Sequence, residues 1–172
     1  MIDDSMLATA ETLLAACRAA GLRIATAESC TGGLIAATLT AIAGSSDVVD
    51  RGFVTYSNEA KTEMLGVPAA LIIGHGAVSE PVARGMANGA LARSQAQLAI
   101  SVTGVAGPGG GSRDKPVGLV WFGCVRAGGE TSTTSRIFPG DRAAVRRATV
   151  ELALRLLRDA ANPVLDAAGR AT

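Results

Sequence analysis

Three short polar segments of this chain each follow an apolar run and carry side chains that can take part in a reaction: Glu28-Ser29, Tyr56-Ser57 and Thr103-Gly104. Each preceding run is short and apolar, which predicts a buried strand. The carboxyl ends of parallel strands meet at one edge of a sheet, where the ligands of open α/β sheets bind. We therefore expect the chemistry of this protein at that edge.

The segment TAESCTGG, residues 26–33, indicates a nucleophile or an anion site. Ser29 is expected at a strand-to-helix turn, where unpaired N–H groups and the helix dipole stabilise a phosphate or an oxyanion. A serine before a helix is also a common N-cap, and this interpretation stays open. Cys30 is a rival nucleophile, although a lone cysteine in such a place is usually a small buried hydrophobe.

A serine nucleophile needs a base, and the sequence offers two kinds. His75, the only histidine, stands in the loop GHGAV, away from the expected edge. Of the 16 cationic residues only Lys61 and Lys115 are lysines, and a desolvated lysine, unlike an arginine, can lose its proton. Lys61 is expected in the first turn of a helix capped by Asn58, where the helix dipole lowers a lysine pKa. A solvated surface lysine is the alternative interpretation.

Two further segments bear on the ligand. The loop GVAGPGGGSRDKP lacks the spacing GxxxxGK[ST] and does not lead into a helix, which disfavours a nucleoside triphosphatase or a Rossmann protein. Arg142, Arg146 and Arg147 stand at the start of the last helix, and arginine there suits phosphate recognition. An exposed basic helix face is the alternative. The acidic residues are too scattered to predict a metal site.

Length and composition predict one folded domain. The chain has 172 residues, of which 48 % are hydrophobic, and its formal net charge is +1. This charge gives no reason to expect nucleic acid or a membrane surface as a partner, and no apolar run reaches the roughly 18 residues of a membrane span. Three scattered cysteines without a CxxC pair predict a reduced, cytoplasmic protein with no disulfide framework.

The hydrophobic pattern alternates strands with helices. Helices are expected over 3–20, 31–44, 58–65, 79–95 and 141–160, and strands over 22–28, 48–57, 97–107, 117–129 and 130–138. This order predicts an α/β sheet with helices on both faces, three parallel strands and an antiparallel strand from the C-terminal hairpin. A kink is expected at Gly52. One domain over 1–160 is followed by a tail over 161–172.

Seven segments, read in order, resemble a known family: AESCTGG, AGSSDVV, RGFVTYSNEAK, GAVSEPVA, TGVAGPGGGS, KPVGLVWF and FPGDRAAVRR. They resemble the C-terminal domain of the CinA family, over about residues 5–158. The resemblance implies a three-layer α/β/α fold with a mixed, mostly parallel sheet of about five strands. It also implies an amidohydrolase that converts nicotinamide mononucleotide (NMN) to nicotinic acid mononucleotide and ammonia in NAD recycling, with no cofactor and no metal.

The resemblance further implies a Ser-Lys mechanism. Ser29 of AESCTGG matches the nucleophile and Lys61 of YSNEAK its base, while Ser46 of AGSSD is a second candidate nucleophile. Arg142 of PGDR would face the phosphate, and Tyr56 would line the site. The full set of residues expected to contact the substrate is Thr31, Gly32, Gly33, Ser46, Tyr56, Thr103, Gly104 and Arg142.

Other classes of function stay open at this stage. A non-catalytic module would hold a phosphorylated nucleotide with the same N–H groups and Arg142, and release it unchanged. A DNA-associated scaffold is disfavoured, because the chain has a near-zero charge and only five aromatic residues. The small side chains of the helices at 31–43 and 79–95 favour a homo-oligomer.

Overall fold

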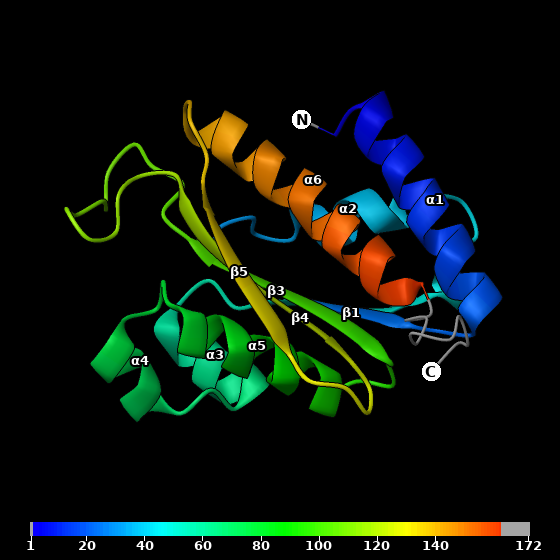
Figure 1. Ribbon diagram of the computed structural model, residues 1–172, viewed down its shortest axis with the longest axis horizontal. Coiled ribbons are helices and arrows are strands. Elements are labelled where there is room, and N and C mark those ends of the chain that lie inside the picture. Colours follow the sequence, from blue (N-terminus) through cyan, green and yellow to red (C-terminus); the bar gives the residue numbers. More distant parts are fainter. Residues whose placement is uncertain (1, 163–172) are drawn as a thin grey trace, which may run out of the picture.

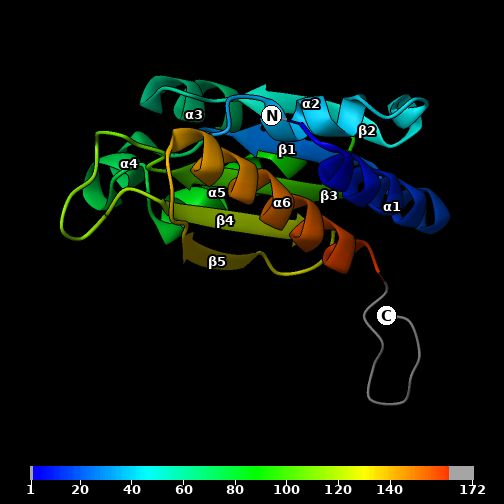
Figure 2. The same cartoon turned by 90° about the horizontal axis from the view of Figure 1, so that it is seen from above.

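The computed structural model describes residues 2–162 and has one five-stranded sheet between two layers of helices (Figure 1). The strands are β1 (Ile24–Glu28), β2 (Val49–Val54), β3 (Leu98–Gly104), β4 (Leu119–Arg126) and β5 (Ser132–Ile137). Figure 2 shows their order, β2-β1-β3-β4-β5. β1 pairs in parallel with β2 and β3, and β4 is antiparallel to β3 and β5. The predicted mixed sheet with one antiparallel strand is confirmed.

Helices cover both faces of this sheet, as predicted. One face carries α1 (Asp4–Ala20), α2 (Leu34–Thr40) and α6 (Arg142–Ala161). The other carries α5 (Glu80–Ala92), with α3 (Asn58–Leu65) and α4 (Ala69–His75) packed beside it (Figure 1). All five residues of β1 are buried, so the central strand has an apolar core on each side.

The strand order reverses beside β1. The chain passes from β1 to β2 on one side, and β3 then pairs with the other side of β1. Ligands of open α/β sheets bind beyond the carboxyl ends of the strands at such a switch point. Ser29 directly follows β1, so it lies at this position.

Capping residues set the start of two helices that matter for the site. Asp141 accepts a hydrogen bond from the Ala144 N–H at 2.9 Å and begins α6, as expected. Ser57, rather than Asn58, caps α3 by accepting from the Ala60 N–H at 3.0 Å. Helical side chains lean toward the N-terminus of their helix. Lys61 therefore reaches back toward the cap of α3 instead of standing in the first turn.

Two other boundaries differ from the sequence expectations. α2 begins at Leu34 and not at residue 31, because Gly32 and Gly33 take left-handed φ values of 61° and 94°. Residues Ala69–His75 form α4, a helix that the sequence pattern did not reveal. Ile72 is its buried residue. The irregularity of β2 also lies elsewhere than expected: its register with β1 shifts between Val49 and Arg51 rather than at Gly52.

The small residues of α5 serve packing inside this chain. A Cβ atom on Gly89 would overlap the carbonyl group of Leu65 in α3, and one on Gly123 would lie 2.6 Å from the carbonyl oxygen of Ala83 in α5. These close approaches account for Gly89 of α5 and Gly123 of β4. The homo-oligomer stays a prediction.

The end of the chain is described only in part. α6 continues to Ala161, which is buried, so the helix runs one residue into the expected tail. Residues 163–172, the rest of that tail, lie outside the described residues. Within residues 2–162, no helix combines the length and the apolar character needed to cross a bilayer.

Candidate active site

Ser29 and Lys61 meet beyond the carboxyl end of β1. The Lys61 Nζ atom lies 3.1 Å from the Ser29 Oγ atom. The Ser29 N–H donates to the carbonyl of Val102 in β3 at 3.0 Å, which fixes the backbone of the serine. The Lys61 side chain is only 1 % exposed. The fold thus places a buried amine against a serine hydroxyl, as a nucleophile with an adjacent base requires.

Two backbone carbonyls orient the Lys61 amine. Nζ donates to the Thr55 carbonyl at 2.9 Å and to the Ser57 carbonyl at 3.3 Å. A neutral amine has two N–H groups and one lone pair. With both N–H groups on carbonyls, the lone pair is left for the proton of the Ser29 hydroxyl. None of the three partners carries a charge that would hold Lys61 protonated.

Burial changes the acidity of both groups that flank Ser29. It lowers the pKa of Lys61 below the ordinary value of 10.5, and the nearby Cys30 and the charge of Glu59 partly oppose this effect. Burial raises the pKa of the Cys30 thiol to about 12. A thiol that keeps its proton is a poor nucleophile, so Cys30 is not a rival to Ser29.

The lowered pKa of Lys61 predicts a pH dependence of the reaction. Because a base must be neutral to accept the Ser29 proton, we expect kcat/KM to rise with pH, with its midpoint at the lowered pKa of Lys61, below 10.5, and to level off above that pKa. Glu59→Gln removes a charge that raises this pKa, so the midpoint should move to lower pH. Glu63→Gln, one turn further along α3, is the control and should leave it unchanged. A midpoint unmoved in Glu59→Gln would show that Lys61 does not control the profile.

The N-terminus of α2 is occupied by the protein's own carboxylate. Glu28 is fully buried and accepts hydrogen bonds from three N–H groups there: Gly33 at 3.1 Å, Ile35 at 3.0 Å and Ala36 at 2.9 Å. The Gly32 N–H donates to the Ser29 carbonyl at 3.1 Å. Gly32 and Gly33 therefore do not offer the free donors that the sequence predicted. Among the N–H groups of residues 30–33, those of Cys30 and Thr31 donate to no other residue within 2–162.

A hollow of about 630 Å³ opens beside this turn. Its lining comes from the loop after β3 and from the start of α6: Ala106, Pro108, Val117, Gly140, Asp141, Arg142, Ala143 and Arg146. Arg146 Nη2 donates to the Thr31 carbonyl at 2.7 Å, so the hollow borders the Ser29 turn. The Ser29–Lys61 pair therefore lies near a space of ligand size.

Two arginines give this hollow a positive charge. Arg142 donates to the Gly107 carbonyl at 3.0 Å and to the Tyr56 hydroxyl at 2.9 Å. Neither Arg142 nor Arg146 forms an ion pair in the part of the chain that the structure describes. Asp141 also lines the hollow, so its three charged residues together carry a net positive charge. Guanidinium groups without an ion pair suit a phosphate. The structure thus brings Tyr56 and Arg142 together beside this hollow.

The chain matches a known family along nearly its whole length. The model of the CinA C-terminal domain matches residues 6–161. This chain belongs to that family. The relationship agrees with the resemblance seen in the sequence motifs, and the predicted family is confirmed.

Curated CinA relatives include both short and long proteins. Nicotinamide-nucleotide amidohydrolase PncC of Escherichia coli K12 is 51 % identical over 157 residues, which cover 91 % of this chain and 95 % of that protein. A CinA-like protein of Akkermansia muciniphila is 53 % identical over 139 residues, which cover 81 % of this chain and 34 % of that protein. This chain therefore spans nearly the whole of the first relative and about a third of the second.

Solved structures of CinA proteins have the same fold. The competence/damage inducible protein CihA from Agrobacterium tumefaciens gives a TM-score of 0.90 at 48 % identity, covering 94 % of this chain and 98 % of that one. The competence damage-inducible protein A (ComA) from Klebsiella pneumoniae gives 0.86 at 41 % identity, covering 90 % and 95 %. The predicted α/β/α architecture is confirmed.

Two residues of this CinA domain that were predicted to contact the substrate, Thr103 and Gly104, contact other parts of the protein instead. Thr103 is 1 % exposed, and its hydroxyl donates to the Ala77 carbonyl at 2.8 Å. A Cβ atom on Gly104 would lie 2.7 Å from the Leu119 carbonyl oxygen, so glycine allows the close approach of β4. Both residues lie at the expected edge, but their visible contacts are structural.

Ser46 and His75 lie apart from the Ser29–Lys61 pair. Ser46 is in the short 3-10 helix Ser45–Asp47, which precedes β2 at the amino ends of the strands. The length of β1, roughly 16 Å at about 3.3 Å per residue, therefore separates it from Ser29. His75 is exposed at the end of α4, where its carbonyl accepts from Lys115 Nζ at 2.6 Å. The structure gives neither side chain a place beside Ser29.

Sequence reasoning missed two residues that support the CinA site. Glu28 was named at the expected edge but given no contact of its own, and Arg146 was named with Arg142 and Arg147 for phosphate recognition but was not expected to hold the Ser29 turn. A carboxylate directly between an apolar run and a helix start is a signal for a buried cap, since helix N–H groups there need acceptors. Arg146 stands four residues after Arg142, which places both on one face of α6.

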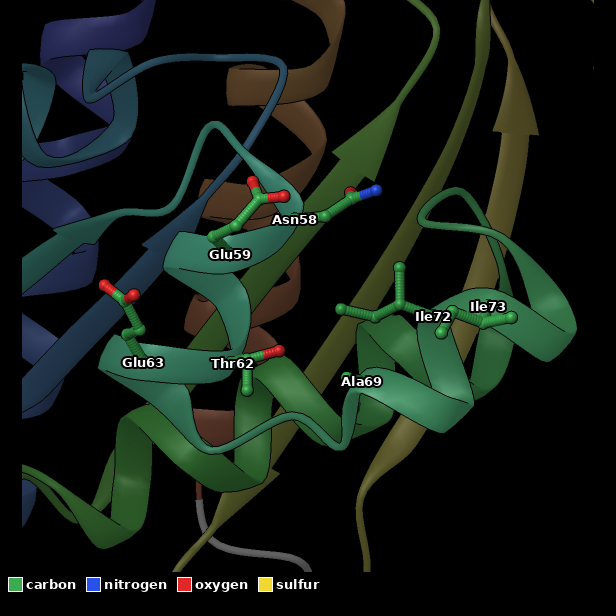
Figure 3. Close-up of a pocket in the computed structure, with 7 residues that line it drawn as sticks. All are labelled: Asn58, Glu59, Thr62, Glu63, Ala69, Ile72 and Ile73. Carbon is green, nitrogen blue, oxygen red and sulfur yellow. The ribbon is translucent and has the colours of Figure 1, made fainter.

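A second hollow is separate from this site. It has a volume of about 350 Å³ and lies between α3 and α4 (Figure 3). Its lining residues are Asn58, Glu59, Thr62, Glu63, Ala69, Ile72 and Ile73. Lys61 is buried, and neither Lys61 nor Ser29 lines this groove.

Proposed function

We propose that this protein hydrolyses the carboxamide of NMN to nicotinic acid mononucleotide and ammonia, as a step in NAD recycling. The observation that carries the proposal is the buried Lys61 Nζ, 3.1 Å from Ser29 Oγ. The identity of 51 % to a relative named nicotinamide-nucleotide amidohydrolase supports the substrate. The two unpaired arginines of the adjoining hollow fit a ligand that carries a phosphate.

The first half of the reaction forms an acyl-enzyme. Neutral Lys61 takes the proton of Ser29 Oγ, and Oγ attacks the carboxamide carbon. The N–H groups of Cys30 and Thr31, free of other residues, stabilise the oxyanion of the tetrahedral intermediate. The carbon–nitrogen bond then breaks, and the Lys61 ammonium protonates the leaving nitrogen, which departs as ammonia.

The second half restores the enzyme. A water molecule attacks the ester carbon and gives a proton to Lys61, which has become neutral again. The bond to Ser29 Oγ breaks, and Lys61 returns the proton to Oγ. The product leaves as the carboxylic acid, so one water is consumed for each ammonia released.

The deciding experiment measures ammonia release from NMN by the purified, EDTA-treated protein. We expect release by the wild type, with nicotinic acid mononucleotide as the second product. A non-catalytic nucleotide-binding module would behave differently: NMN would raise the melting temperature and be recovered unchanged. That outcome would overturn the proposed function.

Arg142 should matter for the phosphate of the substrate. A hydrogen bond to a charged group contributes about 1.5–3 kcal/mol, so Arg142→Ala should lower kcat/KM for NMN by about 10- to 100-fold. The same variant should change kcat/KM for nicotinamide riboside, which lacks the phosphate, by less than about threefold. Arg155→Ala, which removes an exposed arginine of the same helix, is the control. Equal losses for both substrates would contradict phosphate binding by Arg142.

Two further aspects belong to this proposal. We place the reaction in the cytoplasm, because Cys17, Cys30 and Cys124 are free thiols in the structure. We keep the prediction of a homo-oligomer, which a sedimentation experiment tests directly.

A further inference from the structure

Glu28 is a buried carboxylate with an unusually complete set of donors. Besides the three N–H groups of the α2 start, it accepts from the Thr31 hydroxyl at 2.6 Å and from the Thr26 hydroxyl at 3.4 Å. It is 0 % exposed and forms no ion pair within residues 2–162. Burying a carboxylate is costly unless hydrogen bonds replace its hydration. A serine at the N-cap of α2 would accept a hydrogen bond from one N–H group without burying a charge. Capping of the helix alone therefore does not require a buried carboxylate with five donors.

The contacts of Glu28 fix the turn that carries Ser29. Thr31 is held at both ends, since its hydroxyl donates to Glu28 and its carbonyl accepts from Arg146 Nη2 at 2.7 Å. Gly33 is tied to the same carboxylate oxygen as Thr31. The peptide units between Ser29 and Thr31 therefore have little freedom to rotate.

This arrangement decides which N–H groups remain for a substrate. The carboxylate takes the N–H groups of Gly33, Ile35 and Ala36. The N–H groups of Cys30 and Thr31 are left without an acceptor in another residue within the described part of the chain. The N–H of the residue after a nucleophilic serine is a recurrent oxyanion donor.

We infer that Glu28 is a positioning residue for the hydrolysis: its carboxylate, through the Thr31 hydroxyl and the start of α2, holds the Cys30 and Thr31 N–H groups in place to bind the oxyanion. The inference rests on the proposed function. Glu28 does not touch the reacting atoms. It acts through the turn, so its loss should impair the step in which the oxyanion forms and leave phosphate binding intact.

Two variants test this role. Thr31→Val removes only the hydroxyl that links the turn to Glu28, and Glu28→Gln replaces the carboxylate by an amide that cannot accept all five hydrogen bonds. Loss of one oxyanion donor typically costs about 10²- to 10³-fold in kcat. Because the turn is loosened rather than removed, we expect kcat for NMN to fall about 10- to 100-fold, with KM changed by less than about threefold. Thr31→Ser keeps a hydroxyl at this position, so its kcat should lie much closer to that of the wild type than the kcat of Thr31→Val does.

A second measurement separates positioning from general damage. The 3-aldehyde analogue of NMN can form a tetrahedral adduct with Ser29 and so carries an oxyanion, whereas nicotinic acid mononucleotide cannot react. In Glu28→Gln and Thr31→Val, the inhibition constant of the aldehyde should rise about as much as kcat falls, while that of the product should stay unchanged. Asp3→Asn is the matched control, since it converts the carboxylate cap of α1 to an amide. It should lower the melting temperature without changing kcat.

The outcomes distinguish this inference from the proposed function. If the wild type releases no ammonia, the proposed function fails. If the wild type is active and folded Thr31→Val keeps kcat within about twofold, only the role of Glu28 is overturned. A rise in KM, or equal weakening of aldehyde and product, would also overturn it, because both would indicate ground-state binding. Should Glu28→Gln not fold, the comparison of Thr31→Val with Thr31→Ser still decides.

Discussion

We expect Ser29→Ala to lower kcat/KM for NMN by roughly 10⁴- to 10⁶-fold, the range found when the nucleophile of a serine hydrolase is removed. The reason is that no acyl-enzyme can form, because alanine has no atom to replace Oγ. The fold should persist, since the Ser29 backbone is held by its N–H bond to Val102 at 3.0 Å. Ammonia release, corrected for the folded fraction from circular dichroism, provides the measurement.

The matched control for this prediction is Ser46→Ala. Ser46 is exposed at the opposite edge of the sheet, so its removal should leave kcat/KM unchanged. Mass spectrometry of wild-type protein quenched during turnover should also find the nicotinoyl ester on the peptide that contains Ser29. Full activity of Ser29→Ala, together with loss of activity in Ser46→Ala, would reassign the nucleophile.

Replacement of Lys61 should have the next largest effect. Loss of the general base typically costs about 10²- to 10⁴-fold, and we expect this loss of kcat in both Lys61→Met and Lys61→Arg. Methionine fills a similar buried volume without a base. Arginine keeps a positive charge but cannot give up its proton in the working pH range. Equal losses would show that the reaction needs a neutral amine and not a cation.

Chemical rescue adds a test that a structural role for Lys61 would not pass. Lys61→Ala removes the amine and leaves space beside Ser29, so added methylamine should restore part of the activity. The rescue should increase with pH, because only neutral methylamine can accept the Ser29 proton. Lys115→Met removes the only other lysine and should keep near-normal turnover. Near-normal turnover of Lys61→Met would instead contradict the Ser-Lys mechanism.

The sequence predicted the layers of the fold because its patterns are local. Apolar runs of five to seven residues and helical stripes mark β1, β3, α1 and α6 directly. The helix start at Asp141 also follows from a local cap. The helix α4 was not predicted. It carries a single buried side chain, Ile72, so its apolar pattern is too weak to detect in the sequence. The late start of α2 depends on the left-handed φ values of Gly32 and Gly33, which glycine permits but does not require.

The site was predicted in part. Ser29, Lys61, Tyr56 and Arg142 were named from the sequence, and the structure brings them to one edge. Ser46 was named from a motif and lies at the other edge, because a motif does not reveal at which end of a strand a serine stands. The hydroxyl of Thr103 was expected to face a substrate, and it binds Ala77, which lies 26 positions earlier in the chain.

The sequence by itself therefore determined which groups can react: a serine at a strand-to-helix turn, and a lysine retained in a chain that otherwise uses arginine. Only the tertiary structure decided their environment. Burial of Lys61 lowers its pKa, and its Nζ atom donates to two backbone carbonyls beside Ser29. The buried Glu28 takes the helix N–H groups that the sequence had left for the substrate. Burial and hydrogen-bond competition arise from residues distant along the chain, so no local pattern can contain them.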